Sequence, residues 1–248
     1  MDFGLAGRRA LVTGASSGLG LSSAAALAAE GVRVVMVARD ADRLGRAAAS
    51  VEGDVYVLPG DVSDISGVGE LVATAAQMLG GLDILVANAG GPPAGTFAST
   101  ELDAYLPALE LNLLSTVAMC TAAVPLMRDG GWGRIVAVTS ISVREPIGNL
   151  ILSNTARAGL TGFLKTLSRE VAGDGITVNS LQPGLHRTPR LVDLHGDAVD
   201  DLGAMIPAGV VGDPDDFGAI AAFLCSDAAR FVTGAAIPVD GGAAHGLQ

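Results

Sequence analysis

A glycine-rich segment near the amino terminus has the residue types needed to hold a phosphate group. It reads TGASSGLG from Thr13 to Gly20 and runs directly into an apolar helical pattern. Glycines in such a segment let the backbone turn sharply, approach a pyrophosphate closely and pack the following helix against the preceding strand. The first turn of a helix also presents unpaired N–H groups and the positive end of its dipole. The segment therefore predicts a dinucleotide-binding turn rather than a tight turn without a ligand.

The elements around this segment alternate between β-branched apolar runs and alanine-rich helical stretches. The expected strands are Arg9–Thr13, Val32–Ala38, Val55–Leu58, Ile84–Asn88, Arg134–Thr139, Thr177–Leu181 and Ala235–Val239. The expected helices are Gly18–Glu30, Ala41–Val51, Val68–Leu79, Glu101–Met127, Asn154–Ala172 and Asp215–Cys225. Strands that are apolar nearly throughout and alternate with helices are typical of a parallel sheet covered on both faces. We therefore expect one α/β domain over residues 1–248, a Rossmann-like doubly wound parallel sheet of about seven strands.

Two stretches have the composition of loops. One spans Gly90–Thr96 and the other Leu185–Pro214, and both are rich in glycine or proline. We expect residues 91–97 and 185–211 to form the walls of a substrate site.

Bulk composition argues against nucleic acid and membrane partners. The chain carries 26 acidic residues against 15 lysines and arginines, a net charge of -11, with no basic block. It therefore lacks the cations that neutralise nucleic-acid phosphates or anionic lipids. The longest uncharged run, Leu111–Met127, contains Pro125 and falls short of the ~20 apolar residues of a membrane span. We expect a buried helix there.

Cysteine usage and the amino terminus favour a cytoplasmic location, as an expectation. Cys120 and Cys225 each lie in an apolar helical pattern and are expected to be buried free thiols. Met1–Arg9 is too short and too polar for a signal peptide. The three histidines are not clustered as metal ligands, so no metal site is expected.

Further motifs follow the glycine-rich turn in a fixed order, and together they resemble those of the short-chain dehydrogenase/reductase family over essentially the whole chain. They are the T-G-x-x-x-G-x-G turn, Asp61-Val62, Asn88-Ala89-Gly90, Asn112, Pro183-Gly184 with Thr188, and Val239-Asp240-Gly241-Gly242. The resemblance implies a nicotinamide dinucleotide as cofactor. The cofactor-binding residues that it implies are Gly14, Ser16, Ser17, Gly18, Leu19, Gly20, Arg39, Asp61, Val62, Asn88, Ala89, Gly90, Arg157, Pro183, Gly184 and Thr188.

The end of the second expected strand bears on which dinucleotide is bound. Members of such folds that use NAD place an acidic residue there, against the ribose 2′-hydroxyl. In this chain Ala38 falls at that position and Arg39 follows it, and a guanidinium can pair with a 2′-phosphate. A shift of one residue would instead make Asp40 the ribose partner. We expect NADP(H) as the preferred cofactor, with NAD(H) as the alternative.

The family's catalytic serine, tyrosine and lysine are matched in spacing but not in chemistry. By the resemblance, Ser140 corresponds to the serine, Ser153 stands where the tyrosine is expected, and Arg157 stands where the lysine is expected. Together with Asn112 they form the expected catalytic set. A phenol has a reference pKa of ~10 and an aliphatic hydroxyl is a far weaker acid, so Ser153 is a poor substitute. Loss of a general acid typically lowers the rate ~10²–10⁴-fold.

Other groups could take over the proton transfer. His186 follows Pro183-Gly184 and would titrate near neutral pH, although we expect an exposed loop histidine there. Ser140 with an ordered water and Tyr105 reaching in from its helix are weaker candidates. Arg144 and Glu145 are expected to pair at the surface rather than to shape the substrate pocket.

Three functions remain open. The first is an NADP(H)-dependent oxidoreductase that interconverts a carbonyl and an alcohol on a small or acyl-type substrate, similar to a 3-oxoacyl reductase, with an atypical proton donor. The second is a redox-inactive dinucleotide-binding sensor or scaffold, and the third a repurposed lyase or isomerase. The resemblance also implies a homotetramer or homodimer that associates through Leu111–Met127 and Asn154–Ala172.

Overall fold

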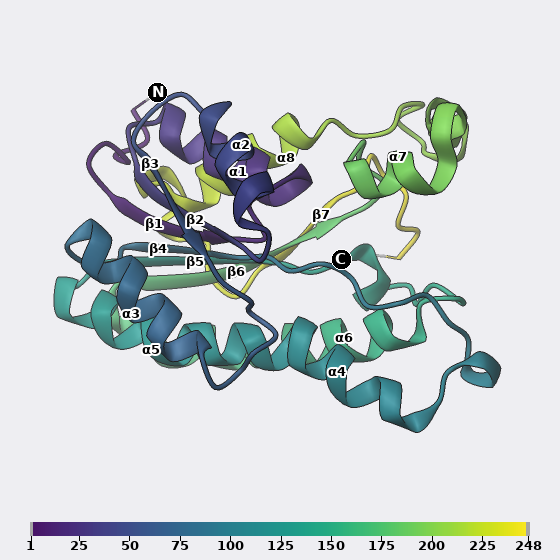
Figure 1. Ribbon diagram of the computed structural model, residues 1–248, viewed down its shortest axis with the longest axis horizontal. Coiled ribbons are helices and arrows are strands. Elements are labelled where there is room, and N and C mark those ends of the chain that lie inside the picture. Colours follow the sequence, from purple (N-terminus) through teal and green to yellow (C-terminus); the bar gives the residue numbers. More distant parts are fainter. Residues whose placement is uncertain (1, 247–248) are drawn as a thin grey trace.

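A parallel β-sheet forms the centre of the computed structural model, which describes residues 2–246 (Figure 1). Its seven strands are ordered β3-β2-β1-β4-β5-β6-β7. Their bounds are β1 Arg9–Thr13, β2 Arg33–Ala38, β3 Val55–Pro59, β4 Ile84–Ala87, β5 Gly133–Val138, β6 Ile176–Pro183 and β7 Ala236–Val239. The predicted Rossmann-like α/β fold is confirmed, and every predicted strand is present to within a few residues.

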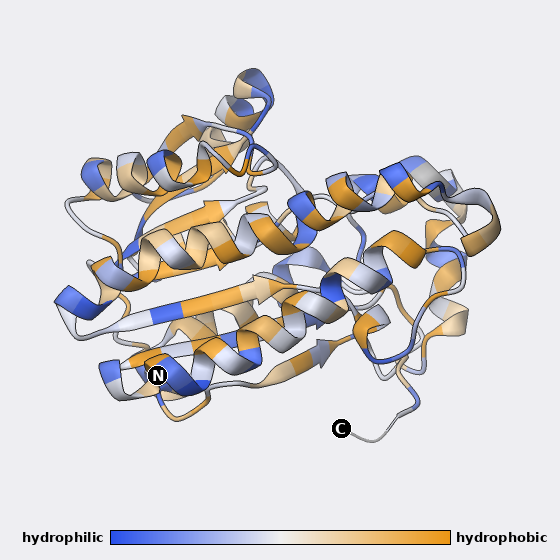
Figure 2. Ribbon diagram, turned by 90° about the horizontal axis from the view of Figure 1, so that it is seen from below, coloured by the Kyte–Doolittle hydropathy of each residue, from blue (hydrophilic) through white to orange (hydrophobic). Residues whose placement is uncertain are grey.

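Two helical layers cover the sheet, one on each face (Figure 1). One layer contains α1 (Gly18–Ala29), α2 (Ala41–Ala49) and α8 (Pro214–Cys225), and the other contains α3 (Val68–Leu79), α5 (Ser115–Gly130) and α6 (Ile151–Val171). Successive strand residues point to opposite faces, so each strand contributes to both layers. Leu11 of β1 lies in the core beneath α3 and α5, whereas Val12 lies in the core beneath α1 and α8. This explains why the strands are hydrophobic along most of their length (Figure 2).

The predicted helix Glu101–Met127 is broken into several pieces. A 3₁₀ turn at Leu102–Ala104 precedes α4 (Tyr105–Leu109), and a π-helical turn at Glu110–Leu114 leads into α5. Pro107 lies in the first turn of α4, where its missing N–H costs nothing. Residues 102–130 form one helical run that is long and apolar enough to cross a membrane, and the α5 part packs its buried face against α3 and the sheet.

The loop predicted for residues 185–214 was wrong in part. The chain forms α7 (Pro189–His195) and a 3₁₀ run at Gly196–Met205. Pro189 is the first residue of α7, which suits its fixed φ, and Gly196 ends the helix with a φ of 56°. The element is shorter than the helices that hydrophobic periodicity identifies, so its starting signal was not recognised.

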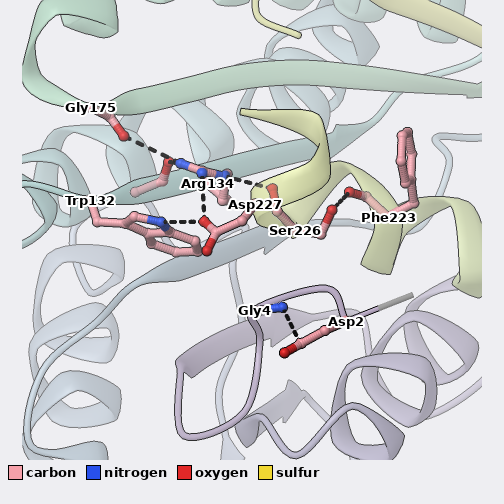
Figure 3. Close-up of polar contacts among 9 residues, drawn as sticks. Asp2, Gly4, Trp132, Arg134, Gly175, Phe223, Ser226 and Asp227 are labelled. Carbon is pink, nitrogen blue, oxygen red and sulfur yellow. Dashed lines mark hydrogen bonds and ion pairs between the residues drawn. The ribbon is translucent and has the colours of Figure 1, made fainter. Parts of the chain in front are cut away.

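The edge of the sheet where β5 begins is held by a polar cluster around Trp132 (Figure 3). The Arg8 and Arg134 guanidinium carbons lie 3.8 and 4.0 Å from the indole centroid. Trp132 Nε1 donates to Asp227 Oδ1 at 3.0 Å, and buried Arg134 pairs with the same oxygen at 3.4 Å. Because this cluster lies at the amino end of the strand, it stabilises the fold on the side away from the strand ends discussed below.

Candidate functional site

A cavity of about 600 Å³ lies at the edge of the sheet where the strands end. It opens where the strand order reverses between β1 and β4, the place at which α/β sheets bind ligands. Its lining comprises Gly14, Ser16, Ser17, Gly18, Leu19, Val37, Ala38, Arg39, Asp40, Arg43, Gly60, Asp61, Val62, Asn88, Ala89, Gly90, Gly91, Leu111, Val138, Thr139, Arg157, Pro183, Thr188, Pro189 and Arg190.

Backbone groups of the glycine-rich turn form the middle of the cavity. Gly14 and Gly18 have positive φ values of 59° and 55°. A Cβ on Gly20 would lie 2.3 Å from the Gly14 carbonyl oxygen, so only glycine permits this packing. No side chain caps the amino end of α1, and its first N–H groups are left for a ligand. The turn therefore fits a pyrophosphate.

The end of the cavity beside β2 and β3 carries two arginines and two carboxylates. Arg39, Arg43, Asp40 and Asp61 all line it, with Val62 beside them. Asp40 is the N-cap of α2, because its side chain accepts a hydrogen bond from the Arg43 N–H at 2.9 Å. Burial raises the pKa of Asp61, but two hydrogen bonds from Ser63 and the charge of Arg39 outweigh it, so this pKa lies below its usual value.

Asn88 joins the ends of β1 and β4 at the point where the strand order reverses. Thr13 Oγ1 donates to the Asn88 carbonyl oxygen at 2.8 Å and accepts from the Asn88 N–H at 3.0 Å. The Asn88 side chain also donates to the Gly14 carbonyl at 3.3 Å. These bonds hold the glycine-rich turn in position against β4.

Asn112 lies in the π-helical turn and reaches the same region. Its Nδ2 donates to the Gly90 carbonyl at 2.8 Å, whereas its buried Oδ1 has no partner among the residues described. Asn112 itself is not among the cavity residues, so it acts on the cavity through the position of Gly90.

The other end of the cavity, beside β5 and β6, contains Arg157. Its side chain is 7% exposed, and Nη1 donates to the carbonyls of Val138 at 2.8 Å and Thr139 at 2.9 Å. Burial, together with the charge of nearby Arg190, lowers the pKa of Arg157 to about 10. The guanidinium therefore remains charged at neutral pH.

The two serines of the expected catalytic set are close to this end but do not line the cavity. Ser153 lies one helical turn before Arg157 on α6 and is 8% exposed. Ser140 lies two residues after the end of β5, and its Oγ accepts a hydrogen bond from the Ser142 N–H at 3.0 Å.

His186 is neither exposed nor part of the cavity lining, so the expectation of an exposed loop histidine was wrong. It is 6% exposed and its ring packs edge-on against Phe217 of α8, with centroids 5.4 Å apart. Its Nδ1 lies 3.3 Å from the Gly184 carbonyl, and burial lowers its pKa. Tyr105 is also absent from the cavity lining. His186 is therefore a packed interior side chain, and neither residue forms part of the cavity wall.

Arg144 and Glu145 do not form the expected surface pair in the part of the chain that is described. Arg144 donates to Gln182 Oε1 and to the Ala236 carbonyl. Glu145 instead accepts from the backbone of His245 and Gly246, which holds the segment before the carboxyl terminus. The two side chains therefore diverge.

The remaining expected cofactor residues divide into two groups. The residues that line the cavity are most of the glycine-rich turn and, outside it, Asp61, Val62, Ala89, Gly90, Pro183 and Thr188. Gly20 and Gly184 do not line it. Gly20 packs against the Gly14 backbone, and a Cβ at position 184 would lie 2.8 Å from Asp240 Cβ and 2.9 Å from Asp240 Cα. Their expected part is thus to shape the cavity.

Sequence reasoning missed two arginines of the cavity. Arg43 follows the Asp40 N-cap by three residues, so the first turn of α2 could have indicated it. Arg190 had no such signal, because α7 was not expected to be a helix. Packing of Thr188 and Pro189 near Gly18 brings Arg190 over the cavity.

Comparison with known proteins decides the family. The model described as Enoyl-(Acyl carrier protein) reductase matches residues 14–244. The human protein Dehydrogenase/reductase SDR family member 4 is 33% identical over 244 residues, covering 96% of this chain and 88% of the relative. The chain belongs to the short-chain dehydrogenase/reductase family. This confirms the resemblance, and the chain is accordingly an oxidoreductase of the short-chain type.

Two further members of the family are similar over the full length. Cis-4-hydroxycyclohexanecarboxylate dehydrogenase of Sinomonas cyclohexanicum is 36% identical over 246 residues, covering 98% of each chain. The crystal structure of L-sorbose reductase from Gluconobacter frateurii, complexed with NADPH and L-sorbose, superposes with a TM-score of 0.95 at 33% identity, covering 100% of each chain. Short-chain dehydrogenases/reductases therefore share this fold from end to end.

Proposed function

We propose that this short-chain dehydrogenase/reductase is an NADP(H)-dependent enzyme that interconverts a carbonyl and an alcohol on a small or acyl-type substrate. The observation that carries the proposal is one continuous cavity with the uncapped amino end of α1 in its middle and a pair of arginines at each end. When bound, the nicotinamide supplies or accepts the hydride. The residues of this chain hold the two reactants in register.

Preference for the phosphorylated cofactor rests on the end beside β2 and β3. Ala38 offers no carboxylate to a ribose 2′-hydroxyl, and Asp40 is engaged as a helix cap. Arg39 and Arg43 supply two guanidinium groups where a 2′-phosphate would lie. L-sorbose reductase, the structural neighbour, was solved with NADPH, which supports the same preference.

The proton path is the atypical part of the proposal. Among the described residues, the polar side chains that line the end beside β5 and β6 are Thr139, Arg157, Thr188 and Arg190. None is an acid near neutral pH. We infer that water delivers the proton to the substrate oxygen while the two guanidinium groups stabilise the negative charge that develops there. A turnover ~10²–10⁴-fold below that of an enzyme with a phenol donor is expected.

Binding and turnover measured together test the proposal. NADPH should bind at least about tenfold more tightly than NADH, because a charge-assisted bond contributes ~1.5–3 kcal/mol. Consumption of NADPH with a panel of ketones, aldehydes and oxo acids, and of NADP⁺ with alcohols, should show slow turnover. Equal or tighter binding of NADH would remove the argument from Arg39 and Arg43.

A redox-inactive dinucleotide-binding protein is the second candidate, favoured by the absence of a side-chain acid from the described cavity lining. Ser153→Tyr separates the two, because it adds a phenol four residues before Arg157 on one helix face. In an oxidoreductase limited by proton transfer, kcat should rise up to ~10²-fold. Ser153→Phe, which adds the ring without the hydroxyl, is the matched control. Tight NADPH binding with no turnover in any variant would support the second candidate.

A further inference from the structure

The loop of residues 141–150 connects β5 to α6 and lies between the two serines of the expected catalytic set. Ser140 immediately precedes it, and Ser153 lies in the first turn of α6. The loop also pairs with the first of the predicted substrate walls, because the Gly95 N–H donates to the Asn149 carbonyl at 2.8 Å. The position of this loop therefore affects the shape of the substrate end of the site.

Glu145, in the middle of this loop, holds the last residues of the described chain by their backbone (Figure 1). Its Oε1 accepts hydrogen bonds from the N–H groups of His245 and of Gly246, the second at 2.7 Å. The bond from Gly246, followed by those from His245, lowers the pKa of Glu145 below its usual value. The His245 ring contributes little, because it is 92% exposed and its Nδ1 lies 3.3 Å from Oε2. The carboxylate therefore binds main chain rather than a side chain.

The same segment is fixed at its other end, where the chain leaves β7. Asp240 accepts hydrogen bonds from the N–H groups of Gly242 at 3.0 Å and Ala244 at 2.9 Å, which close a compact turn. Gly242 has a φ of 84°, a conformation that favours glycine. We call residues 240–246 the C-terminal strap, since they are anchored at Asp240 and at Glu145.

Between its two anchors the C-terminal strap contacts two further parts of the substrate end. Asp240 is so close to Gly184 that a Cβ at position 184 would lie 2.9 Å from Asp240 Cα. Gly184 follows Pro183, which lines the cavity. The Gly241 carbonyl accepts a hydrogen bond from the Ala208 N–H at 3.0 Å, beyond the helical segment that begins with α7. The strap thus joins the cavity wall, the α7 segment and the loop between β5 and α6.

We propose that Glu145 is a positioning residue, which acts through the C-terminal strap to fix the separation of the loop between β5 and α6 from the α7 segment. The inference rests on the proposed function, because it concerns the substrate end of the same cavity. Glu145 does not line the cavity, so its influence passes through the backbone that it holds. With both anchors in place the substrate meets a preformed site, and less binding energy is lost in ordering the walls.

Glu145→Ala releases the strap at one anchor. With the carbonyl substrate that the wild-type protein reduces fastest, KM should rise at least about fivefold and kcat should change less than about twofold, because ordering of the walls is a cost of binding. The dissociation constant for NADPH should stay within about twofold, since the phosphate-binding turn lies in another part of the cavity. Glu145→Gln keeps an oxygen that accepts from the backbone, so KM should return to within about twofold of the wild-type value.

Amide hydrogen exchange gives a readout that needs no turnover. In Glu145→Ala, peptides that cover residues 141–150 and 240–246 should exchange at least about fivefold faster, whereas peptides of α1 should be unchanged. Asp240→Ala releases the other anchor and should produce the same faster exchange in residues 141–150 and the same rise in KM. Because both substitutions act through one segment, the double variant should be no worse than the more affected single variant.

Two controls separate this role from a loss of charge or of a surface contact. His245→Ala removes the exposed ring and keeps the backbone N–H that Glu145 binds. Glu52→Ala removes an exposed carboxylate just before β3, at the edge of the sheet where the strands begin. Neither substitution should change KM or the exchange of residues 141–150.

The outcomes distinguish this inference from the function on which it rests. Failure of the wild-type protein to bind NADPH or to reduce any carbonyl would refute the proposed function, and the positioning role with it. Normal turnover with the same KM in Glu145→Ala would overturn only the positioning role, even if exchange became faster. Unchanged exchange in residues 141–150, or additive effects in the double variant, would show that the strap does not hold the loop. Asp240→Ala supplies the same measurements should Glu145→Ala fail to fold.

Discussion

Replacing Gly20 with alanine should both destabilise the protein and weaken binding of NADPH. An alanine in a helix interior is ordinarily favoured over glycine by ~1 kcal/mol. Here the added Cβ would lie 2.3 Å from the Gly14 carbonyl oxygen and 2.7 Å from Asn88 Nδ2. Backbone atoms cannot yield as a flexible side chain does, so α1 must move away from the turn. Overpacking of this kind costs ~1–3 kcal/mol, which at least offsets the helix preference and exceeds it over most of that range.

The same displacement moves the amino end of α1 away from the pyrophosphate. We expect the NADPH dissociation constant to rise at least about tenfold, since one lost charge-assisted bond amounts to ~1.5–3 kcal/mol. Fluorescence titration with NADPH and urea unfolding, both monitored on the same preparations, measure the two effects.

Gly45→Ala is the matched control, because it makes the same change in a helix without the overlap. Gly45 lies in α2, and a Cβ there would meet no atom within 4 Å. Its free energy of unfolding should rise by up to ~1 kcal/mol with NADPH binding unchanged. Gly20→Ala behaving like Gly45→Ala in both assays would refute the argument that close backbone contact requires this glycine.

Three more outcomes are expected. Arg39→Ala should weaken NADPH about 10- to 100-fold and NADH less than about threefold by fluorescence titration; an equal loss for both would show that Arg39 does not recognise the 2′-phosphate. Asp227→Ala should lower the free energy of unfolding, measured in urea, by ~2 kcal/mol, because buried Arg134 loses its carboxylate. It should also shift the fluorescence emission of the single tryptophan. No change in the free energy of unfolding would mean that the nearby carbonyls are sufficient partners for Arg134. Burial lowers the pKa of His186 below its value in the unfolded chain, so the unfolded chain binds a proton first as pH decreases. The free energy of unfolding should therefore be at its full value above a pH of ~6.5 and fall as pH decreases toward the folded pKa. His186→Asn should flatten this slope between pH 7.5 and 5.5, and an unchanged slope would assign it to other groups.

Local sequence pattern was sufficient for the sheet and for the turn that precedes α1. Strands such as Arg33–Ala38 are apolar on both faces because both faces are covered, and that pattern is visible without knowledge of the partner strands. The glycines at 14 and 18 were recognisable because positive φ values favour glycine wherever they occur. In both cases the residues that determine the local structure lie within a few positions of it in the sequence.

The arginines beside β5 and β6 could not be assigned in this way. Arg157 was found by its spacing from Ser153, but its burial and its hydrogen bonds to the Val138 and Thr139 carbonyls depend on how α6 packs against β5. His186 was expected at the surface because the flanking residues are loop-like, yet Phe217, 31 positions further along the chain, covers it.

The sequence alone was sufficient for the parallel sheet and the glycine-rich turn, since these depend on backbone conformation and on hydrophobic periodicity along short segments. Its ordered motifs carried the resemblance to the family. Only the tertiary structure decided which charged side chains share the cavity. Electrostatic interaction depends on distance and burial in space, and α7 brings Arg190 to Arg157 across 33 positions of the chain.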